Sequence, residues 1–173
     1  MTRAARLDLR SFQQELATRL AAKTAAQVES SRLGLASGSE RWLIRLADAG
    51  EVIGVPPIVP VPLTKPWFLG LANIRGNLFS VIDFPAFLGH PPVVLDNLAR
   101  LILVNARNGE QNAGIVVQRV LGLRNLSQLR PAHDDTEPPA WQVQRWLDTD
   151  GTTWQEIDLG KLSRDPTFLQ VGA

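Results

Sequence analysis

The residues that could carry acid–base chemistry are few and lie in segments that read as turns or loops. The chain has two histidines, His90 between Gly89 and Pro91, and His133 directly before Asp134. A histidine that is oriented by an aspartate can activate a serine, but no serine lies in a G-x-S-x-G elbow between a strand and a helix. The sequence therefore disfavours a hydrolase.

Metal and nucleotide chemistry have equally little support. The candidate metal ligands are His133, Asp134, Asp135 and Glu137, and a single histidine beside carboxylates in a loop is more often solvated than metal-bound. The chain has no glycine-rich phosphate loop, no dinucleotide fingerprint, no cysteine and no tyrosine. We therefore expect no enzyme, no cofactor and no metal.

Charge and hydropathy point towards protein partners in a reducing compartment. Lysine and arginine number 18 against 17 acidic residues, a net charge of +1, so no global field favours nucleic acid or anionic lipid. No apolar run approaches the ~20 residues of a membrane helix, and the first ten residues are too polar for a secretory signal. The absence of cysteine suits the cytoplasm.

The most informative group of residues is Gly70, Asn73, Arg75, Gly76 and Asp83. Arg75 precedes a tight turn and can pair with a carboxylate, either on a partner or on Asp83 of the same chain. Asn73 is expected to bond to backbone at the strand edge. The two glycines suit positive φ or the close approach of another backbone.

These residues must be positioned by short strands. Leu71 to Arg75 and Leu78 to Ile82 predict a hairpin that turns at Gly76-Asn77. Further strands are expected at Trp42–Leu46, Glu51–Val55, Arg100–Asn105, Ala113–Val117, Val120–Leu123 and Thr153–Ile157. The second of these would return antiparallel to the first, and Asn108-Gly109 is the clearest hairpin turn. Five prolines between Pro56 and Pro66 exclude a central strand and predict an edge or a surface strap.

The N-terminal stretch from Ser11 to about Val28 predicts a helix, because Phe12, Leu16 and Leu20 recur at a spacing of four. Its narrow apolar stripe favours a helix that lies on its own domain, with a partner-docking arm as the alternative. Ser30 to Ser39 resembles a flexible lead-in.

Several short elements complete the prediction. Pro66 to Gly70 could form one helical turn, Phe84 to Gly89 a short helix, and Leu159 to Ser163 a helix capped by Asp158. Pro131 to Gly151 is expected to be a long acidic loop. Its two tryptophans, Trp141 and Trp146, would pin that loop to the core.

The run from Gly70 to Gly76 follows the pattern G-x-x-N-x-R-G; the apolar stretch after it ends in Val81-Ile82-Asp83, and Leu88-Gly89 follows. This order closely resembles the signature of the CheW-like domain family, and the resemblance extends from about Arg41 to Lys161. The N-terminal extension and the proline-rich strap look most like the branch of the type IV pilus (twitching motility) pathway, typified by PilI.

The resemblance implies a mainly β fold of two packed five-stranded Src-homology-3-like barrels, with an N-terminal helix and short connecting and C-terminal helices. It implies residues 1–40 as helix and lead-in, 41–165 as the CheW-like domain and 166–173 as a C-terminal tail. It also implies a non-catalytic adaptor that couples chemoreceptors to a histidine kinase in membrane-associated arrays. The partners would be the tip of a PilJ-like receptor and the regulatory domain of a CheA-type (ChpA-like) kinase.

The site residues implied by the resemblance surround the hairpin. The receptor contacts would be Gly70, Asn73, Arg75, Gly76, Ile53 and Val55, with Asp83 structural and no kinase contact assigned. Ile53, Val55 and Ile58 could form a groove wall, although core packing suits at least two of them. The rival function is a stand-alone β-barrel module that binds a peptide or ligand in a pocket lined by Trp42, Trp67 or Trp154.

Overall fold

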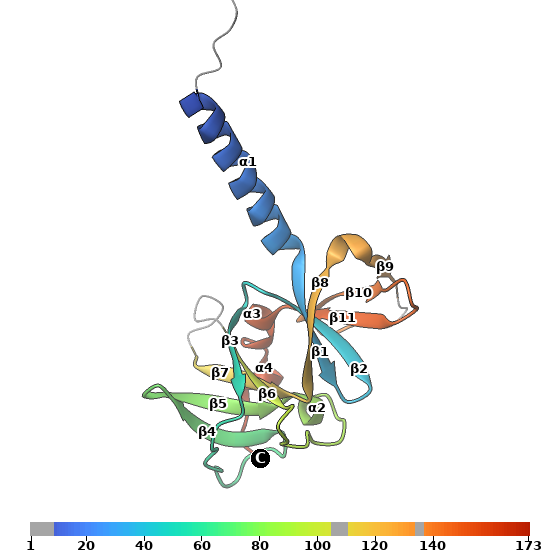
Figure 1. Ribbon diagram of the computed structural model, residues 1–173. Helices are drawn as coiled ribbons and strands as arrows, with labels where there is room; N and C mark the ends of the chain where they lie inside the picture. The colour runs from blue at the N-terminus through green and yellow to red at the C-terminus, as the bar shows by residue number, and fades with distance from the viewer. Residues whose placement is uncertain (1–8, 105–110, 134–136) are drawn as a thin grey trace, which may run out of the picture.

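The computed structural model describes residues 9–104, 111–133 and 137–173, with side chains described from residue 13 onward. Its strands form two sheets that pack against each other (Figure 1). The first sheet has the order β8-β1-β2-β11-β10-β9, from β1 (Ser31–Ser37), β2 (Glu40–Arg45), β8 (Arg119–Asn125), β9 (Arg130–Ala132), β10 (Gln142–Leu147) and β11 (Thr153–Ile157). The second has the order β3-β6-β7-β5-β4, from β3 (Ala49–Gly54), β4 (Phe68–Ile74), β5 (Asn77–Asp83), β6 (Arg100–Val104) and β7 (Ala113–Val117).

The mainly β prediction is confirmed, although the first sheet has six strands where five were expected. Four short helices connect or close the sheets: α2 (Phe84–Phe87), the 3-10 helix η1 (Leu126–Gln128), α3 (Leu159–Leu162) and α4 (Pro166–Leu169). Asp158 caps α3 as predicted, since its side chain accepts a bond from the Lys161 amide. The predicted turn at Asn108-Gly109 lies outside the described residues.

The largest core lies between the sheets. Its members include Leu35, Trp42 and Ile44 from the first sheet and Ile82, Ile102, Ile115 and Val117 from the second. Strand β7 shows how one strand serves two cores: Ile115 and Val117 join this shared core, and Val116 joins an inner core on the other face of the second sheet. Successive side chains of a strand point to opposite faces, so β7 is buried along its whole length.

Strand β3 does not return along β2, contrary to the prediction. Both edges of β2 are occupied, by β1 antiparallel and by β11 parallel, and β3 pairs with β6 in the second sheet. The chain turns from one sheet to the other after β2, where Arg45 pairs with Asp48 at 2.8 Å and Asp158 at 3.1 Å. Partial burial acts to lower the pKa of Arg45, but the hydrogen bond and charge of Asp48, with the charge of Asp158, outweigh it and raise the pKa.

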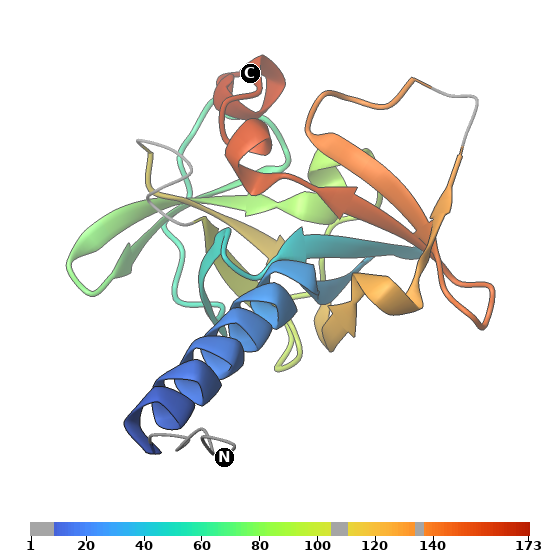
Figure 2. The same cartoon turned by 90° about the horizontal axis from the view of Figure 1, so that it is seen from above.

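Helix α1 (Leu9–Ser30) projects away from the two sheets (Figure 1, Figure 2). Every side chain from Gln13 to Glu29 is exposed, including Leu16 and Leu20. The prediction that this helix lies on its own domain is therefore wrong. The flexible lead-in over Ser30 to Ser39 is also wrong, because β1 occupies it and pairs with both β2 and β8.

The proline-rich strap follows the edge of the second sheet, as predicted. Val59 and Leu71 exchange two backbone hydrogen bonds of 2.8 and 2.9 Å, which attach the strap to β4. The predicted helical turn over Pro66 to Gly70 is wrong: a turn closes from the Phe68 amide to the Lys65 carbonyl, and β4 begins at Phe68. The C-terminal residues pack here too, since the Lys65 amide donates to the Val171 carbonyl at 2.8 Å.

The long loop predicted over Pro131 to Gly151 is wrong in part, because β9 and β10 form within it. Sequence reasoning missed β9 because Pro131 lacks an amide donor, which an edge strand tolerates. Trp141 is buried in the shared core, as expected of a residue that pins this segment. Trp146 lies in β10, and its indole N–H donates to Glu156 at 2.8 Å.

Candidate functional site

The β4–β5 hairpin turns at Arg75-Gly76, one residue earlier than predicted. Both residues have positive φ, 52° for Arg75 and 86° for Gly76, which is the pattern of a primed two-residue turn. Asn73 bonds to backbone as expected: its Oδ1 accepts a 2.8 Å bond from the Gly76 amide. Asn73 therefore fixes the turn, and the turn presents the Arg75 side chain to solvent.

Arg75 pairs with Glu51 and not with Asp83. The distance from Arg75 Nη2 to Glu51 Oε1 is 2.6 Å, and the two side chains are 76% and 34% exposed. Glu51 lies on β3 and Arg75 at the β4–β5 tip, at opposite ends of the second sheet's strand order. The ion pair therefore joins the two ends of a strongly curved sheet, as in a barrel.

Asp83 is 1% exposed, and its carboxylate accepts hydrogen bonds from backbone amides of the same chain. One carboxylate oxygen accepts a 2.9 Å bond from the Ala86 amide and caps α2, and the other accepts a 2.9 Å bond from the Val93 amide. A buried carboxylate needs such donors, because an unpaired one would cost several kcal/mol. Asp83 thus anchors both the helix and the loop that follows the hairpin.

Gly70 is buried beneath the strap of its own chain. It has a φ of +132°, and a Cβ at this position would lie 2.1 Å from the Val59 carbonyl oxygen. Gly76 differs, because a Cβ there would meet nothing within 4 Å and only its φ requires glycine. The lack of a side chain at Gly70 therefore lets the strap pack against β4, whereas glycine at position 76 allows the positive φ of the turn.

Ile53 and Val55 are half-buried and pack, with Ile58, against the inner core of the second sheet. Core packing was the expected alternative for at least two of these three. More exposed apolar side chains lie beside them in the chain: Val52 at 38% and, on the strap, Val59 at 68% exposure. The segment that follows the Arg75–Glu51 pair along β3 and the strap is thus apolar and accessible.

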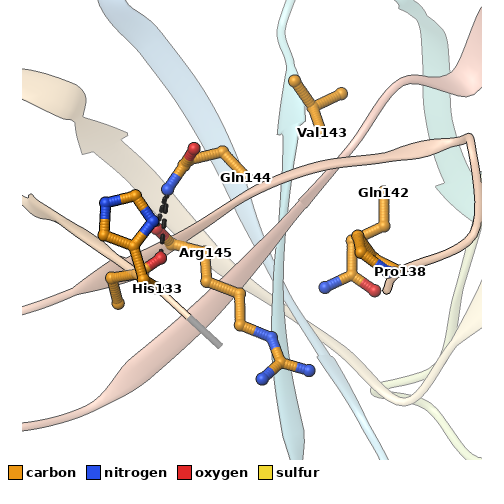
Figure 3. Close-up of a pocket in the computed structure, with 7 residues that line it drawn as sticks. His133, Pro138, Gln142, Val143, Gln144 and Arg145 are labelled. Carbon is orange, nitrogen blue, oxygen red and sulfur yellow. Dashed lines mark hydrogen bonds between the residues drawn. The ribbon is translucent and has the colours of Figure 1, made fainter. Parts of the chain in front are cut away.

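Two cavities lie away from this hairpin. The smaller, about 130 Å³, is bounded by β9 and β10 and includes His133 and Arg145 (Figure 3). Gln144 lines it and donates hydrogen bonds to the carbonyls of Ala132 and Arg145 (Figure 3). The larger, about 490 Å³, is lined by Trp42 but not by Trp67 or Trp154. Of the three tryptophans proposed for a ligand pocket, Trp42 therefore lines this cavity and the other two do not.

Of the residues considered for catalysis or metal binding, His90 is 34% exposed at its side chain and lies 3.3 Å from Glu40. Asp134 and Asp135 lie outside the described residues, and within the described ones no group of three or more acidic or histidine side chains could hold a metal ion. In the same part of the chain, no helix combines the length and the apolarity that crossing a bilayer demands.

Glu51 was missed by sequence reasoning. It lies far from Arg75 in the sequence, and the only signal for the pair was the acidic residue within a predicted strand. Asp83 was the nearer acid and the natural candidate, but its burial and its two amide donors leave it no role with Arg75.

The sequence matches the profile of the CheW-like domain over residues 33–166. It is 32% identical over 112 residues to the protein PilI of Pseudomonas aeruginosa, and 26% identical over 100 residues to a probable chemotaxis protein CheW of Rhizobium etli. These matches cover 62% and 58% of this chain, and 62% and 63% of the relatives.

A solved structure shares the fold. The scaffolding protein TtCheW of Thermoanaerobacter tengcongensis superposes with a TM-score of 0.63 at 22% identity, covering 75% of this chain and 89% of that one. The profile match spans both sheets and includes the hairpin with Asn73, Arg75 and Gly76. The chain therefore belongs to the CheW-like domain family.

Proposed function

We propose that this protein is a non-catalytic adaptor that couples a chemoreceptor to a CheA-type histidine kinase on the cytoplasmic side of the membrane. The observation that carries the proposal is the β4–β5 tip, where a fixed turn presents an arginine that is 76% exposed. An adaptor needs two binding faces and no turnover, and multivalent contacts let a small receptor change reach many kinases.

The receptor would bind at the Arg75–Glu51 pair and the neighbouring apolar segment. An exposed ion pair contributes only about 0–1 kcal/mol, so Arg75 can exchange Glu51 for a receptor carboxylate at little cost. Ile53 and Val55, which are both half-buried and lie at alternate positions, would supply the apolar part of the contact. Gly70 would act indirectly, by holding the strap in place.

We further propose that the pathway is the one that controls type IV pilus twitching motility, with a PilJ-like receptor and a ChpA-like kinase. The support is the 32% identity to PilI. In this proposal the protein is recruited from the cytoplasm to receptor arrays, and its CheW-like domain includes β1, which pairs with β2 and β8, and α4, whose Phe168 is buried in the shared core.

The test is binding of the purified chain to the helical tip of a PilJ-like receptor and to the regulatory domain of a ChpA-like kinase. Arg75→Glu should abolish receptor binding and leave kinase binding intact. Arg19→Glu is a matched control, since Arg19 is also 76% exposed and also forms a 2.6 Å ion pair, with Glu15 on α1. The adaptor proposal fails if the unmodified chain binds neither partner.

A further inference from the structure

The 490 Å³ cavity lies where the two sheets and the C-terminal helices meet, away from the Arg75–Glu51 pair. Its walls come from the start of β2, the end of α2, the segment that leads into β10, and α4. This volume is within the range of pockets that bind small ligands or single side chains.

The floor of the cavity is aromatic and rigid. Trp42 and Trp141 are 2% and 6% exposed, with ring centroids 6.0 Å apart, and Phe87 lies 6.2 Å from Trp141. Phe87 also contacts Trp67 and Phe168 edge-on, so its ring is held from two further sides. Trp42 and Trp141 are almost fully covered, so the half-buried Phe87 is the most accessible of these rings. Ring faces carry negative quadrupole density, so this accessible ring attracts a cation with an apolar stem.

The rim adds two carboxylates. Glu40 faces His90 at 3.3 Å, and Asp165 caps α4 through Oδ1, which accepts bonds from the amides of Thr167 and Phe168. Asp165 Oδ2 accepts no hydrogen bond within the described part of the chain. No lysine or arginine is among the described residues that line the cavity, so these carboxylates have no fixed basic partner in it except the histidine.

We propose that this cavity binds an arginine side chain presented by a partner protein. A guanidinium stacks on an aromatic face and at the same time donates to carboxylates, which a compact ammonium does less well. The proposal does not depend on receptor binding at Arg75, because Glu40 and Asp165 belong to other elements than Arg75 and Glu51.

The experiment titrates the full chain with a blocked Gly-Arg-Gly peptide and follows the indole N–H signals of its tryptophans by NMR. Isosteric citrulline and lysine peptides test the charge and the guanidinium shape. We expect saturable shifts at millimolar concentrations for Trp42 and Trp141, weaker ones with lysine and none with citrulline. Equal shifts with citrulline, or none with arginine, would overturn the proposal.

Variants locate the site. Asp165→Asn keeps a side-chain oxygen for the α4 cap while removing the charge, and together with Glu40→Gln it should weaken arginine binding about fivefold. Asp96→Asn is the matched control, since Asp96 Oδ1 also accepts two backbone amides but lies outside the cavity. A loss as large in the control as in the double variant contradicts the site. Agmatine binding as tightly as the peptide would contradict a protein partner in favour of a free cation.

Discussion

At the scale of single residues, Arg75 holds a conformation that arginine rarely adopts. Its φ of 52° lies in the left-handed region, which costs a non-glycine residue about 1 kcal/mol. The neighbouring Gly76 adopts its φ of 86° without a comparable cost. A strained residue at an exposed tip is poorly explained by stability, and binding is the physical reason we give for it.

Replacement of Arg75 by asparagine separates stability from binding. Asparagine tolerates the left-handed region, so we expect Arg75→Asn to change the free energy of unfolding by less than about 1 kcal/mol in either direction, the strain relief offsetting the lost ion pair. Receptor binding should nevertheless be lost. Urea unfolding and receptor pull-down measure the two quantities, and retained binding would show that Arg75 is not a contact residue.

Gly70 and Gly76 should respond differently to alanine. Gly76→Ala should cost about 1 kcal/mol, because only its positive φ opposes a side chain. Gly70→Ala should cost about 3 kcal/mol or more, because the strap must also move away from a Cβ that would lie 2.1 Å from Val59 O. Thermal and urea unfolding of the two variants compare them directly. Equal losses would mean that the strap is not held where the structure places it.

The candidate site was only partly predictable at this scale. Asn73 and the glycines could be interpreted because their roles are local, within a few residues along the chain. The Arg75–Glu51 pair could not, because it depends on how far the second sheet curls to bring β3 near the β4–β5 tip. Sequence spacing contains no direct information on that curvature.

At the scale of elements, α1 contributes little to the folded body. Its side chains from Gln13 to Glu29 are exposed, so little apolar surface is buried between the helix and the sheets. Removal of residues 1–28 should therefore leave the Tm of the β domain within about 2 °C of the full chain. Differential scanning calorimetry measures this, with loss of helical circular dichroism as the internal control. A drop of many degrees would place α1 on the domain after all.

A buried ion pair between β1 and β11 lies directly beneath the end of α1. Arg32 Nε lies 2.6 Å from Glu156 Oε1, with side chains 10% and 6% exposed, and its Nη1 donates to the Glu29 carbonyl at the end of α1. Glu156→Gln leaves Arg32 buried without a counter-charge and should cost about 3–5 kcal/mol. Glu15→Gln, which breaks an exposed pair on α1, should cost less than about 1 kcal/mol. Urea midpoints distinguish these expectations, and equal midpoints would contradict them.

Strand β1 shows why one element escaped prediction. The stretch that contains it, Ser30 to Ser39, has four serines and two glycines and therefore resembles a linker. Gly34 is nonetheless a packing residue, because a Cβ there would lie 3.0 Å from a ring carbon of Trp154 and 3.2 Å from the Gly122 carbonyl. A small residue required by close packing and a small residue in a flexible segment look the same in a sequence.

At the scale of the whole molecule, local sequence patterns predicted where most strands lie along the chain. They did not predict which sheet each strand joins. The family resemblance supplied the two-part architecture, whereas the pairing of β3 was wrong because adjacency in the chain suggested a hairpin with β2. The pairs that organise the fold, β2 with β11 and β5 with β7, are parallel and long-range. Neither is visible in local periodicity.

The shared core predicts that both sheets unfold together. Phe84 is fully buried in it, edge-on to Trp42 at 5.3 Å, and Phe84→Ala should lower the free energy of unfolding by about 3–5 kcal/mol. Leu43 is buried in the separate cluster of the first sheet with Leu129 and Trp154, and Leu43→Ala should cost about 2–5 kcal/mol.

Native-state amide exchange then tests the coupling. If the molecule is one cooperative unit, each substitution lowers the protection of the slowest amides in β6 and β7 by as much as in β2 and β11. Leu43→Ala is the decisive variant, because its side chain belongs to a cluster that the second sheet does not share. If β6 and β7 keep full protection in that variant, the sheets unfold separately. In that case the second sheet, which carries the proposed receptor site, would not be coupled cooperatively to the first sheet.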